Sequence, residues 1–288
     1  MMKRFLLVDG NYLMFQSFYA TYRPDSSYIM SNQEGVTTNG TFQFFNMLTN
    51  LIQEVRPDYL FIAFDAPGKT FRHEKLDSYK DNRVSAPVII FDQFKWTKHI
   101  LNDLNIPHAE IVGAEADDLI ATLSTLEDTQ KIIYSADKDL LQLVNQDICI
   151  IKRNAREGIF EYINLANFES HYEIRPEQII DYKGLFGDTS DNLPGVKGIG
   201  DKTAKKLLLQ YGNWDTIYQN LDNLTPSVRK KLIEGKESGE LCRELATLKK
   251  DVAQLNHNLD SYELNISDNY ETLEYLELDR IINKFEKI

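Results

Sequence analysis

Short runs of apolar residues alternate with amphipathic stretches along the first half of this 288-residue chain. The apolar runs predict buried strands at Phe5–Val8, Tyr59–Phe64, Lys131–Ser135 and Ile148–Ile151. The amphipathic stretches predict helices at Thr41–Val55, Asp92–Leu104 and Glu115–Leu126. Apolar strands that alternate with helices are typical of a mainly parallel central sheet flanked by helices. The pattern therefore predicts the α/β fold class for this part of the chain.

The character of the sequence changes near Tyr172, where strand signals fade. Helices separated by Gly and Pro turns are predicted at Pro176–Phe186, Lys202–Tyr211, Trp214–Asn220 and Pro226–Ile233. We expect an α/β domain over residues 1–171, a helical domain over 172–256 and an acidic segment over 257–288 that packs on the first domain. An insert over about residues 71–94 is too long for a simple turn, and such inserts are usually functional or mobile.

The composition excludes several classes of protein. No apolar run approaches about 18 residues, so no membrane span is predicted. The apolar run at Phe5–Val8 is far too short for a signal peptide, and we expect it to be a buried strand of a cytoplasmic protein. Cys149 and Cys242 lie in no metal-binding or redox motif, which favours a reduced compartment and two inert thiols.

The net charge of −12 argues at first against a nucleic-acid partner. Nine of the acids, however, belong to one predicted metal site, where cations would largely neutralise them. The tail over His257–Ile288 holds eight acids and three bases, so the remainder of the chain is slightly basic. The distribution of charge is therefore compatible with DNA binding.

Nine acidic residues stand at predicted strand ends, turns and helix starts. They are Asp9, Asp65, Glu115, Asp117, Asp118, Asp137, Asp139, Asp188 and Asp191. Each group alone also fits a solvated helix start or a polar turn. Their coincidence at one predicted edge of the sheet favours a site for hard divalent ions, which prefer oxygen ligands. Two such ions about 4 Å apart can activate a water and stabilise the leaving oxygen of a phosphodiester.

Other catalytic chemistries find little support in the sequence. There is no Ser/His/Asp set, and the five histidines show no zinc-ligand spacing. Pro67-Gly68-Lys69-Thr70 ends like an ATP-binding phosphate loop, but that pattern needs a glycine where Ala63 stands. An ATP-using enzyme is therefore disfavoured.

A glycine-rich stretch, Gly195–Ala204, predicts a tight hairpin that opens a helix. Free backbone N–H groups at such a point can meet a phosphate. Lys197, Lys202, Lys205 and Lys206 would add a salt-sensitive attraction to DNA. The alternative is a plain turn between two helices.

Together these motifs resemble the bacterial and phage 5′-nuclease family, which includes flap endonucleases and the nuclease domain of bacterial DNA polymerase I. The matching stretches are collinear and span nearly the whole chain. They are Leu7–Gly10, Phe64–Ala66, Phe71–Glu74, Tyr79-Lys80, Glu115–Asp118, Ser135–Asp139, Gly187–Gly200 and the final segment Tyr270–Phe285. The resemblance implies a PIN-like α/β nuclease core with a helix–hairpin–helix domain, as a stand-alone protein without an attached polymerase.

The resemblance also implies roles for individual residues. The nine acids match the ligands of two Mg²⁺ ions, for which Mn²⁺ can substitute. Residues matched to the catalytic basic groups are Lys80, Arg83 and Lys183. Residues matched to DNA contacts outside the hairpin are Thr37, Thr38, Arg72 and Tyr79, with the tyrosine stacking on a base. Residues of the helix–hairpin–helix that grips duplex DNA, with a bound K⁺, are Lys197, Gly198, Gly200, Lys202 and Thr203.

The expected function is 5′-3′ exonuclease or flap endonuclease activity on DNA, leaving 5′-phosphates and removing 5′ flaps or RNA primers. The expected partners are DNA with a 5′ end or flap, RNA/DNA hybrids and a separate DNA polymerase, and the expected state is a monomer. Two alternatives stay open: a catalytically inactive structure-specific DNA-binding protein, and a PIN-like ribonuclease. The resemblance implies that the insert over about residues 71–94 forms a helical arch, which admits single-stranded 5′ DNA. The apolar segment Val84–Phe91 departs from the family, in which this arch is usually more polar.

Overall fold

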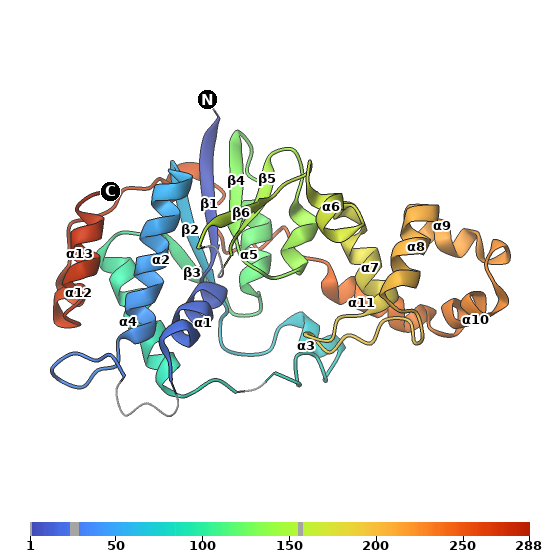
Figure 1. Ribbon diagram of the computed structural model, residues 1–288, viewed down its shortest axis with the longest axis horizontal. Coiled ribbons are helices and arrows are strands. Elements are labelled where there is room, and N and C mark those ends of the chain that lie inside the picture. The colour runs from blue at the N-terminus through green and yellow to red at the C-terminus, as the bar shows by residue number, and fades with distance from the viewer. Residues whose placement is uncertain (1, 24–28, 84, 155–157) are drawn as a thin grey trace. The chain divides into compact units, whose positions relative to one another are not determined.

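The computed structural model describes residues 2–23, 29–83, 85–154 and 158–288 (Figure 1). The chain forms two compact units. Unit 1 contains Met1–Ala66, Ser85–Ala136 and Asp251–Ile288, and unit 2 contains Pro67–Val84 and Asp137–Lys250. Both units therefore combine stretches that are distant along the chain, and the expected domain boundaries after residues 171 and 256 stay a prediction.

Unit 1 is built on a parallel sheet. Its strands are ordered β3 (His108–Glu110), β2 (Tyr59–Phe64), β1 (Lys3–Asp9) and β4 (Thr129–Tyr134), and each pairs in parallel with the next. All of β2 and most of β1 are buried, as expected for strands covered on both faces. The sheet confirms three predicted strands. The sequence did not predict β3, because three residues of mixed polarity carry no periodic signal.

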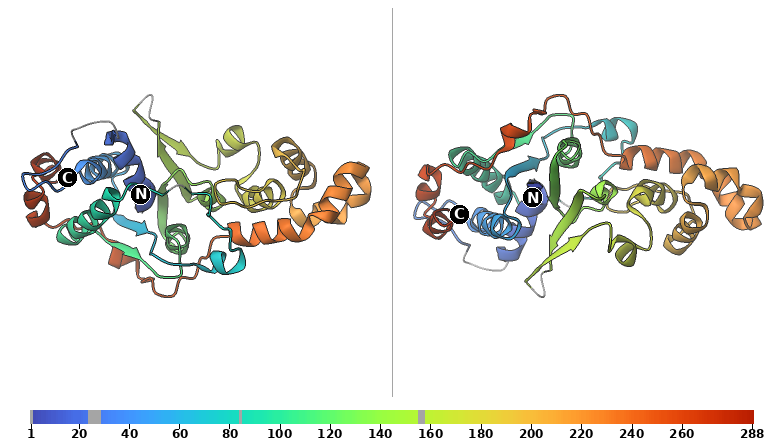
Figure 2. Two further views of the ribbon diagram at one scale, coloured as in Figure 1. Left: turned by 90° about the horizontal axis from the view of Figure 1, so that it is seen from below. Right: turned by 90° about the horizontal axis from the view of Figure 1, so that it is seen from above.

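Helices cover both faces of this sheet (Figure 2). On one face lie α1 (Gly10–Thr21) and α2 (Asn39–Val55), and on the other lies α5 (Ala116–Leu123). A further helix, α4 (Ile89–Asp103), packs against α2. The three helices predicted for this unit are confirmed. The sequence did not predict α1, because its apolar residues are spread around the helix and leave almost no amphipathic pattern.

The C-terminal stretch of unit 1 packs on its sheet and helices. It contains η4 (Leu259–Tyr262), α12 (Glu271–Tyr275) and α13 (Asp279–Phe285). The backbone N–H of Leu264 donates to the carbonyl oxygen of Asp58 at 2.9 Å. The Tyr262 ring meets Phe61 of β2 edge-on, with ring centroids 5.4 Å apart. Buried apolar side chains thus anchor this acidic stretch within unit 1.

Unit 2 combines an antiparallel strand pair with helices. The strand β5 (Ile148–Arg153) pairs with β6 (Phe160–Ile163), which confirms the predicted strand at Ile148–Ile151. Its short helices are α3 (Phe71–Lys75), η1 (Asp139–Leu143), α6 (Phe168–Tyr172), η2 (Pro176–Gln178) and η3 (Leu221–Asn223). Its longer helices are α7 (Ile179–Phe186), α8 (Asp201–Tyr211), α9 (Trp214–Gln219), α10 (Pro226–Glu234) and α11 (Lys236–Ala246). The predicted helical region is confirmed, with α11 added to it.

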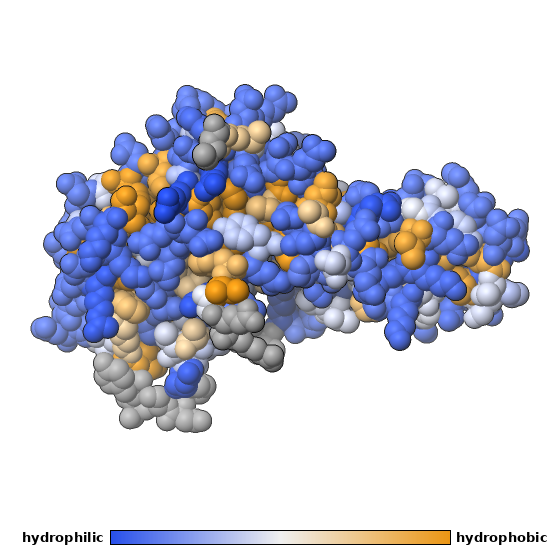
Figure 3. Space-filling model, turned by 45° about the horizontal axis from the view of Figure 1, so that its top comes forward, coloured by the Kyte–Doolittle hydropathy of each residue, from blue (hydrophilic) through white to orange (hydrophobic). Residues whose placement is uncertain are grey.

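None of the described helices has both the length and the apolar character needed to cross a membrane. The face drawn in Figure 3 is mostly hydrophilic, with the hydrophobic colour in separate patches. In the apolar stretch that was expected to shape an arch, Val88 is 78% exposed and Phe91 is 54% exposed, whereas Val84 lies outside the described residues. Isolated exposed apolar side chains of this kind are ordinary on a protein surface.

Candidate active site

Asp9 ends β1 and also caps the N-terminus of α1. Its Oδ1 accepts a hydrogen bond from the backbone N–H of Tyr12 at 2.8 Å, and its Oδ2 accepts one from Ser135 Oγ at 2.8 Å. An aspartate at this position satisfies a helix N–H group and complements the positive end of the helix dipole. The carboxylate is therefore fixed at the carboxyl end of a buried parallel strand, with its side chain largely buried.

Asp65 follows β2 and contacts the first turn of α5. Its Oδ1 accepts a hydrogen bond from the N–H of Ala116 at 2.8 Å, and its Oδ2 accepts one from Asn11 Nδ2 at 3.0 Å. Glu115 caps α5, and its backbone N–H donates to Asp118 Oδ2 at 3.2 Å. Unit 1 therefore brings Asp65, Glu115 and Asp118 together around one helix N-terminus.

Acids of unit 2 surround the ammonium group of Lys183 on α7. Lys183 forms ion pairs with Asp139 and Asp188, and its Nζ lies 2.6 Å from Asp188 Oδ2. The N–H of Asp139 donates in turn to Asp137 Oδ1 at 2.8 Å. Lys183 is only 4% exposed, and a buried charge is costly unless it is paired. The lysine and these carboxylates therefore stabilise one another.

The charges of this cluster shift the pKa values of its members. Burial raises the pKa of Asp188, but the charge of Lys183 and hydrogen bonds from Lys183 and Ser190 outweigh burial and hold the pKa at about 2. Burial raises the pKa of Asp137 above its ordinary value, because the attraction of Lys183 does not compensate fully and Asp191 adds repulsion. The carboxylates of Asp137, Asp139 and Asp188 thus share the charge of Lys183, an arrangement of oxygen atoms that suits a further cation.

Asp191 is held by the segment that precedes Val84. Arg83 Nη2 lies 2.9 Å from Asp191 Oδ1, and the Tyr79 hydroxyl donates to Oδ2 at 3.2 Å. The N–H of Lys80 donates to the backbone oxygen of Asp191 at 3.2 Å. Burial lowers the pKa of Arg83, but the neighbouring Asp191 carboxylate outweighs it and the pKa is raised. Two predicted catalytic residues, Lys80 and Arg83, therefore contact a predicted metal ligand.

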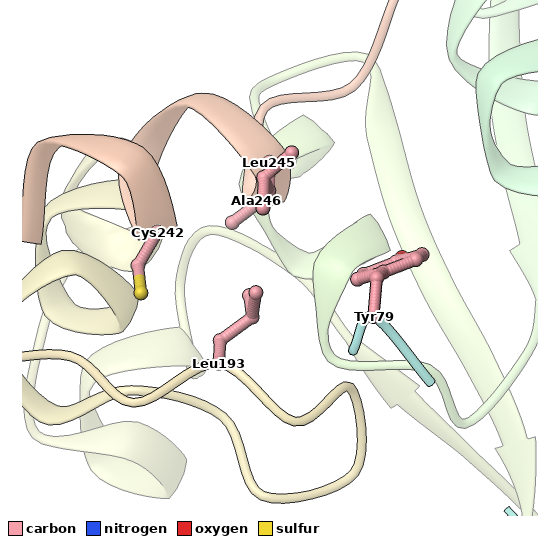
Figure 4. Packing of buried hydrophobic residues seen from close by; sticks show 5 residues of the cluster. All are labelled: Tyr79, Leu193, Cys242, Leu245 and Ala246. Atoms are coloured by element: carbon pink, nitrogen blue, oxygen red, sulfur yellow. The ribbon is translucent and has the colours of Figure 1, made fainter. Parts of the chain in front are cut away.

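Tyr79 does not offer the open stacking surface that the resemblance implied. Its side chain is 2% exposed. It packs in a cluster with Leu193, Cys242, Leu245 and Ala246 (Figure 4). An apolar ring gains free energy from such burial while its hydroxyl keeps a hydrogen-bond partner. In this conformation the ring has no face open to a nucleobase.

We expect Tyr79→Ala to lower the free energy of unfolding by about 3–5 kcal/mol, as is typical when a fully buried aromatic side chain is removed. Tyr19→Ala is the matched control, because the Tyr19 side chain is 51% exposed. Its expected loss is about 1 kcal/mol. Urea denaturation followed by circular dichroism measures both values. Equal losses in the two variants would show that Tyr79 is not part of the packed core.

Arg72 is likewise buried, at 1% exposure, and does not face solvent. Its Nε donates to the carbonyl oxygen of Leu245 at 2.8 Å, and its Nη2 donates to that of Thr247 at 3.3 Å. The last carbonyl groups of a helix lack partners within the helix, so the guanidinium stabilises the end of α11. The phosphate contact that the resemblance implied for Arg72 is therefore not available in this conformation.

The two predicted DNA-facing threonines differ in exposure. Thr38 precedes α2 and is 1% exposed. Thr37 is partly exposed and lines a hollow of about 440 Å³ together with Trp96 and His99 of α4. The Thr37 side chain is therefore accessible to DNA, whereas the Thr38 side chain is not.

The predicted hairpin lies between α7 and α8. Val196 and Ile199 are buried, and the N–H of Val196 donates to the carbonyl oxygen of Leu185 at 3.0 Å. These contacts fix the hairpin against α7. Its accessible residues are the exposed Lys197, Gly198, Gly200 and Lys202 and the partly exposed Thr203. All five predicted DNA-binding residues of the hairpin thus reach solvent.

The described residues contain no group of three or more Asp, Glu, His or Cys side chains already arranged around a metal position. Hydrogen bonds and ion pairs engage the carboxylates instead, as at Asp9, Asp65 and Asp188. Asp117, in the first turn of α5, is partly exposed. The chemistry of the donor set still suits Mg²⁺ or Mn²⁺, because every donor is a carboxylate oxygen. The Lys183 ammonium shows that the unit 2 acids accommodate a cation among them.

Carboxylates at the ends of parallel strands, together with an exposed hairpin between two helices, are the features of a hydrolytic nuclease with an α/β core. Residues 4–173 match the family described as 5′-3′ exonuclease, N-terminal resolvase-like domain. Residues 174–270 match the family described as 5′-3′ exonuclease, C-terminal SAM fold. The chain belongs to the 5′-3′ exonuclease family, which confirms the resemblance drawn from the sequence.

Similar curated proteins support this assignment. A 5′-3′ exonuclease of Mycoplasmopsis pulmonis is 32% identical over 292 residues, which cover 99% of this chain and 94% of that protein. DNA polymerase I of Caldicellulosiruptor bescii is 34% identical over 98% of this chain but only 33% of its own length. The match to the exonuclease is thus nearly end to end, whereas the match to the polymerase covers one part of it.

Solved structures share the fold. The bacteriophage T5 flap endonuclease, in a complex with DNA and metal ions, has a TM-score of 0.71 and 20% identity, covering 96% of this chain and 100% of that chain. The catalytic core of Rad2, in a complex with a DNA substrate, has a TM-score of 0.62 and 15% identity, covering 98% of this chain and 92% of that chain. These likenesses confirm a mainly parallel sheet flanked by helices with a C-terminal helical part.

Proposed function

We propose that this protein is a structure-specific nuclease that hydrolyses DNA phosphodiester bonds at 5′ ends and at 5′ flaps, leaving 5′-phosphates. Its task would be the removal of flaps or RNA primers during replication and repair. The observation that carries the proposal is the group of largely buried carboxylates, those of Asp137, Asp139 and Asp188, that share the charge of Lys183. The names of the relatives, an exonuclease, a DNA polymerase I and a DNA-bound flap endonuclease, support DNA as the substrate.

The nine acids are proposed to hold two divalent ions, Mg²⁺ in the cell with Mn²⁺ as a substitute. When bound, such ions lower the pKa of the attacking water and stabilise charge on the leaving oxygen. The protein's own contribution is to fix the carboxylates before substrate arrives. In unit 1 the N–H groups at the starts of α1 and α5 orient Asp9 and Asp65, and in unit 2 Lys183 orients Asp139 and Asp188.

Three basic residues would stabilise negative charge that develops on the phosphate. They are Lys80, Arg83 and Lys183. Arg83 and Lys183 form ion pairs with carboxylates in this conformation. A metal ion that binds those carboxylates would leave the two basic side chains available to the phosphate. The exposed hairpin is proposed to bind duplex DNA through its backbone, with a K⁺ ion, which makes recognition depend on shape and not on base sequence. We further propose a cytoplasmic monomer that acts beside a separate DNA polymerase, and RNA/DNA hybrids as additional substrates.

The decisive experiment is cleavage of a 5′-labelled flap duplex with Mg²⁺, beside a no-metal control, a blunt duplex and a matched RNA hairpin. Metal-dependent release of the flap near its junction is the expected result. Tight binding without product in either Mg²⁺ or Mn²⁺ would favour a catalytically inactive DNA-binding protein. Equal cutting of the RNA hairpin and the flap would favour a PIN-like ribonuclease.

A further inference from the structure

The hairpin between α7 and α8 presents unpaired backbone donors beside basic side chains. Among the described residues, the N–H groups of Gly200, Asp201 and Lys202 have no hydrogen-bond acceptor. Lys197 and Lys202 are both exposed. The proposed function uses this surface for the phosphates of duplex DNA. The following inference rests on that proposed function.

A lysine from another helix reaches the same hairpin. The Nζ atom of Lys231, on α10, donates a hydrogen bond to the carbonyl oxygen of Gly198 at 3.0 Å. Its aliphatic stem lies so close that a Cβ atom added to Gly198 would meet Lys231 Cε at 3.1 Å and Cδ at 3.3 Å. Since Gly198 is exposed, this contact holds the ammonium group of Lys231 at the tip of the hairpin.

The three consecutive basic residues of α10 differ in their partners. Arg229 pairs with Asp222 at 2.8 Å, and Lys230 lies 3.7 Å from Glu234. Among the described residues Lys231 forms no ion pair with a carboxylate, and the hydrogen-bond partner of its side chain is the neutral carbonyl group of Gly198. An ammonium group has three N–H donors, so two of them stay available to an anion.

We propose that Lys231 is a DNA-binding residue that adds a fixed phosphate contact to the hairpin. The hydrogen bond to Gly198 fixes its ammonium group at the carbonyl oxygen of this hairpin residue before DNA arrives. A contact ordered in advance costs less entropy on binding than one from a freely moving lysine. The ligand it recognises is the sugar–phosphate backbone of a duplex, irrespective of base sequence.

The test compares Lys231→Gln with Lys230→Gln in the full-length protein. Glutamine at position 231 removes the charge but keeps an N–H donor for the Gly198 carbonyl oxygen, so the hydrogen bond that supports the hairpin is retained. Affinity for a blunt duplex is measured in EDTA at several salt concentrations. We expect Lys231→Gln to weaken binding and to reduce the slope of log affinity against log salt by about 1, the value for one lost phosphate contact. Lys230→Gln and Lys231→Arg should keep the slope of the parent protein.

Thermal denaturation of each variant separates charge from structure. If Lys231→Gln keeps the slope of the parent protein, the inference is wrong, whether or not the melting temperature falls. A purely structural role of Lys231 would change stability but not the release of counterions from DNA. A parent protein that fails to bind duplex DNA at any salt concentration would contradict the proposed function itself. The two failures are therefore distinguishable.

Discussion

Asp188→Asn is expected to reduce the rate of flap cleavage by about 10³-fold or more, because loss of a charged metal ligand removes several kcal/mol of transition-state stabilisation. The structure prepares Asp188 for this role. Its pKa of about 2 keeps it ionised at neutral pH, and Lys183 and Ser190 fix its two oxygens. An asparagine is neutral and presents an NH₂ group to one of these donors. Single-turnover cleavage of a 5′-labelled flap at saturating Mg²⁺ measures the effect.

The matched control is Asp222→Asn, which removes a carboxylate of the same unit whose side chain is 84% exposed. It should leave cleavage unchanged. Titration of Mn²⁺ into each protein without DNA provides a second readout, in which Asp188→Asn should bind more weakly and Asp222→Asn should match the parent protein. Affinity for duplex DNA should survive in both variants. Undiminished cleavage by Asp188→Asn would remove this residue from the mechanism.

Much of the fold could be predicted because the sheet of unit 1 is buried on both faces. Strands such as β2 then appear as continuous apolar runs, and the acids that follow them stand out. The helix α1 could not be predicted, because its buried residues are not confined to one side. A further difference concerns the insert before Val84. Its residues are charged and aromatic, which suggests an exposed segment. Arg72 and Tyr79 are nevertheless buried, because α11, which lies far along the chain, supplies carbonyl groups to Arg72 and apolar side chains to Tyr79.

In the candidate site, too, the sequence could not predict contacts between residues that are distant along the chain. The positions of the acids followed from local pattern, whereas their partners depend on tertiary contacts. Asn11 and Ser135 hold Asp65 and Asp9, and each lies within two residues of a predicted ligand, so proximity to the motif was the available signal. The contact between Lys231 and the hairpin carries no such signal, because Lys231 and Gly198 lie 33 positions apart in the sequence. Residue type and spacing can locate charges in a sequence, but pairings of this range need the folded chain.

Gly195→Ala is expected to lower the free energy of unfolding by about 3–5 kcal/mol or more. Losses of this size are typical of substitutions that strain the backbone or cause clashes in packed regions. Gly195 has a φ of +63°, and a Cβ atom there would lie 2.4 Å from the backbone nitrogen of Gly187. Backbone atoms cannot move aside as a flexible side chain can. The N–H of Gly195 also donates to Cys242 Sγ at 3.2 Å, and its carbonyl oxygen accepts from Ser238 Oγ at 2.7 Å, which ties the loop to α11.

The control for this prediction is Gly212→Ala. Gly212 has a similar φ of +86°, but a Cβ atom there would meet nothing within 4 Å. Only the cost of a sparsely populated backbone conformation, about 1–3 kcal/mol, applies at its φ of 86° and ψ of −49°. Urea denaturation compares the two variants, and duplex affinity is measured under conditions where both are folded. Gly195→Ala should also bind duplex DNA and Mn²⁺ more weakly, because the loop over residues 187–195 carries two proposed metal ligands and leads directly into the hairpin. Equal stability losses in the two variants would show that this loop relaxes around a side chain, and the clash with Gly187 would then not explain why glycine is needed there.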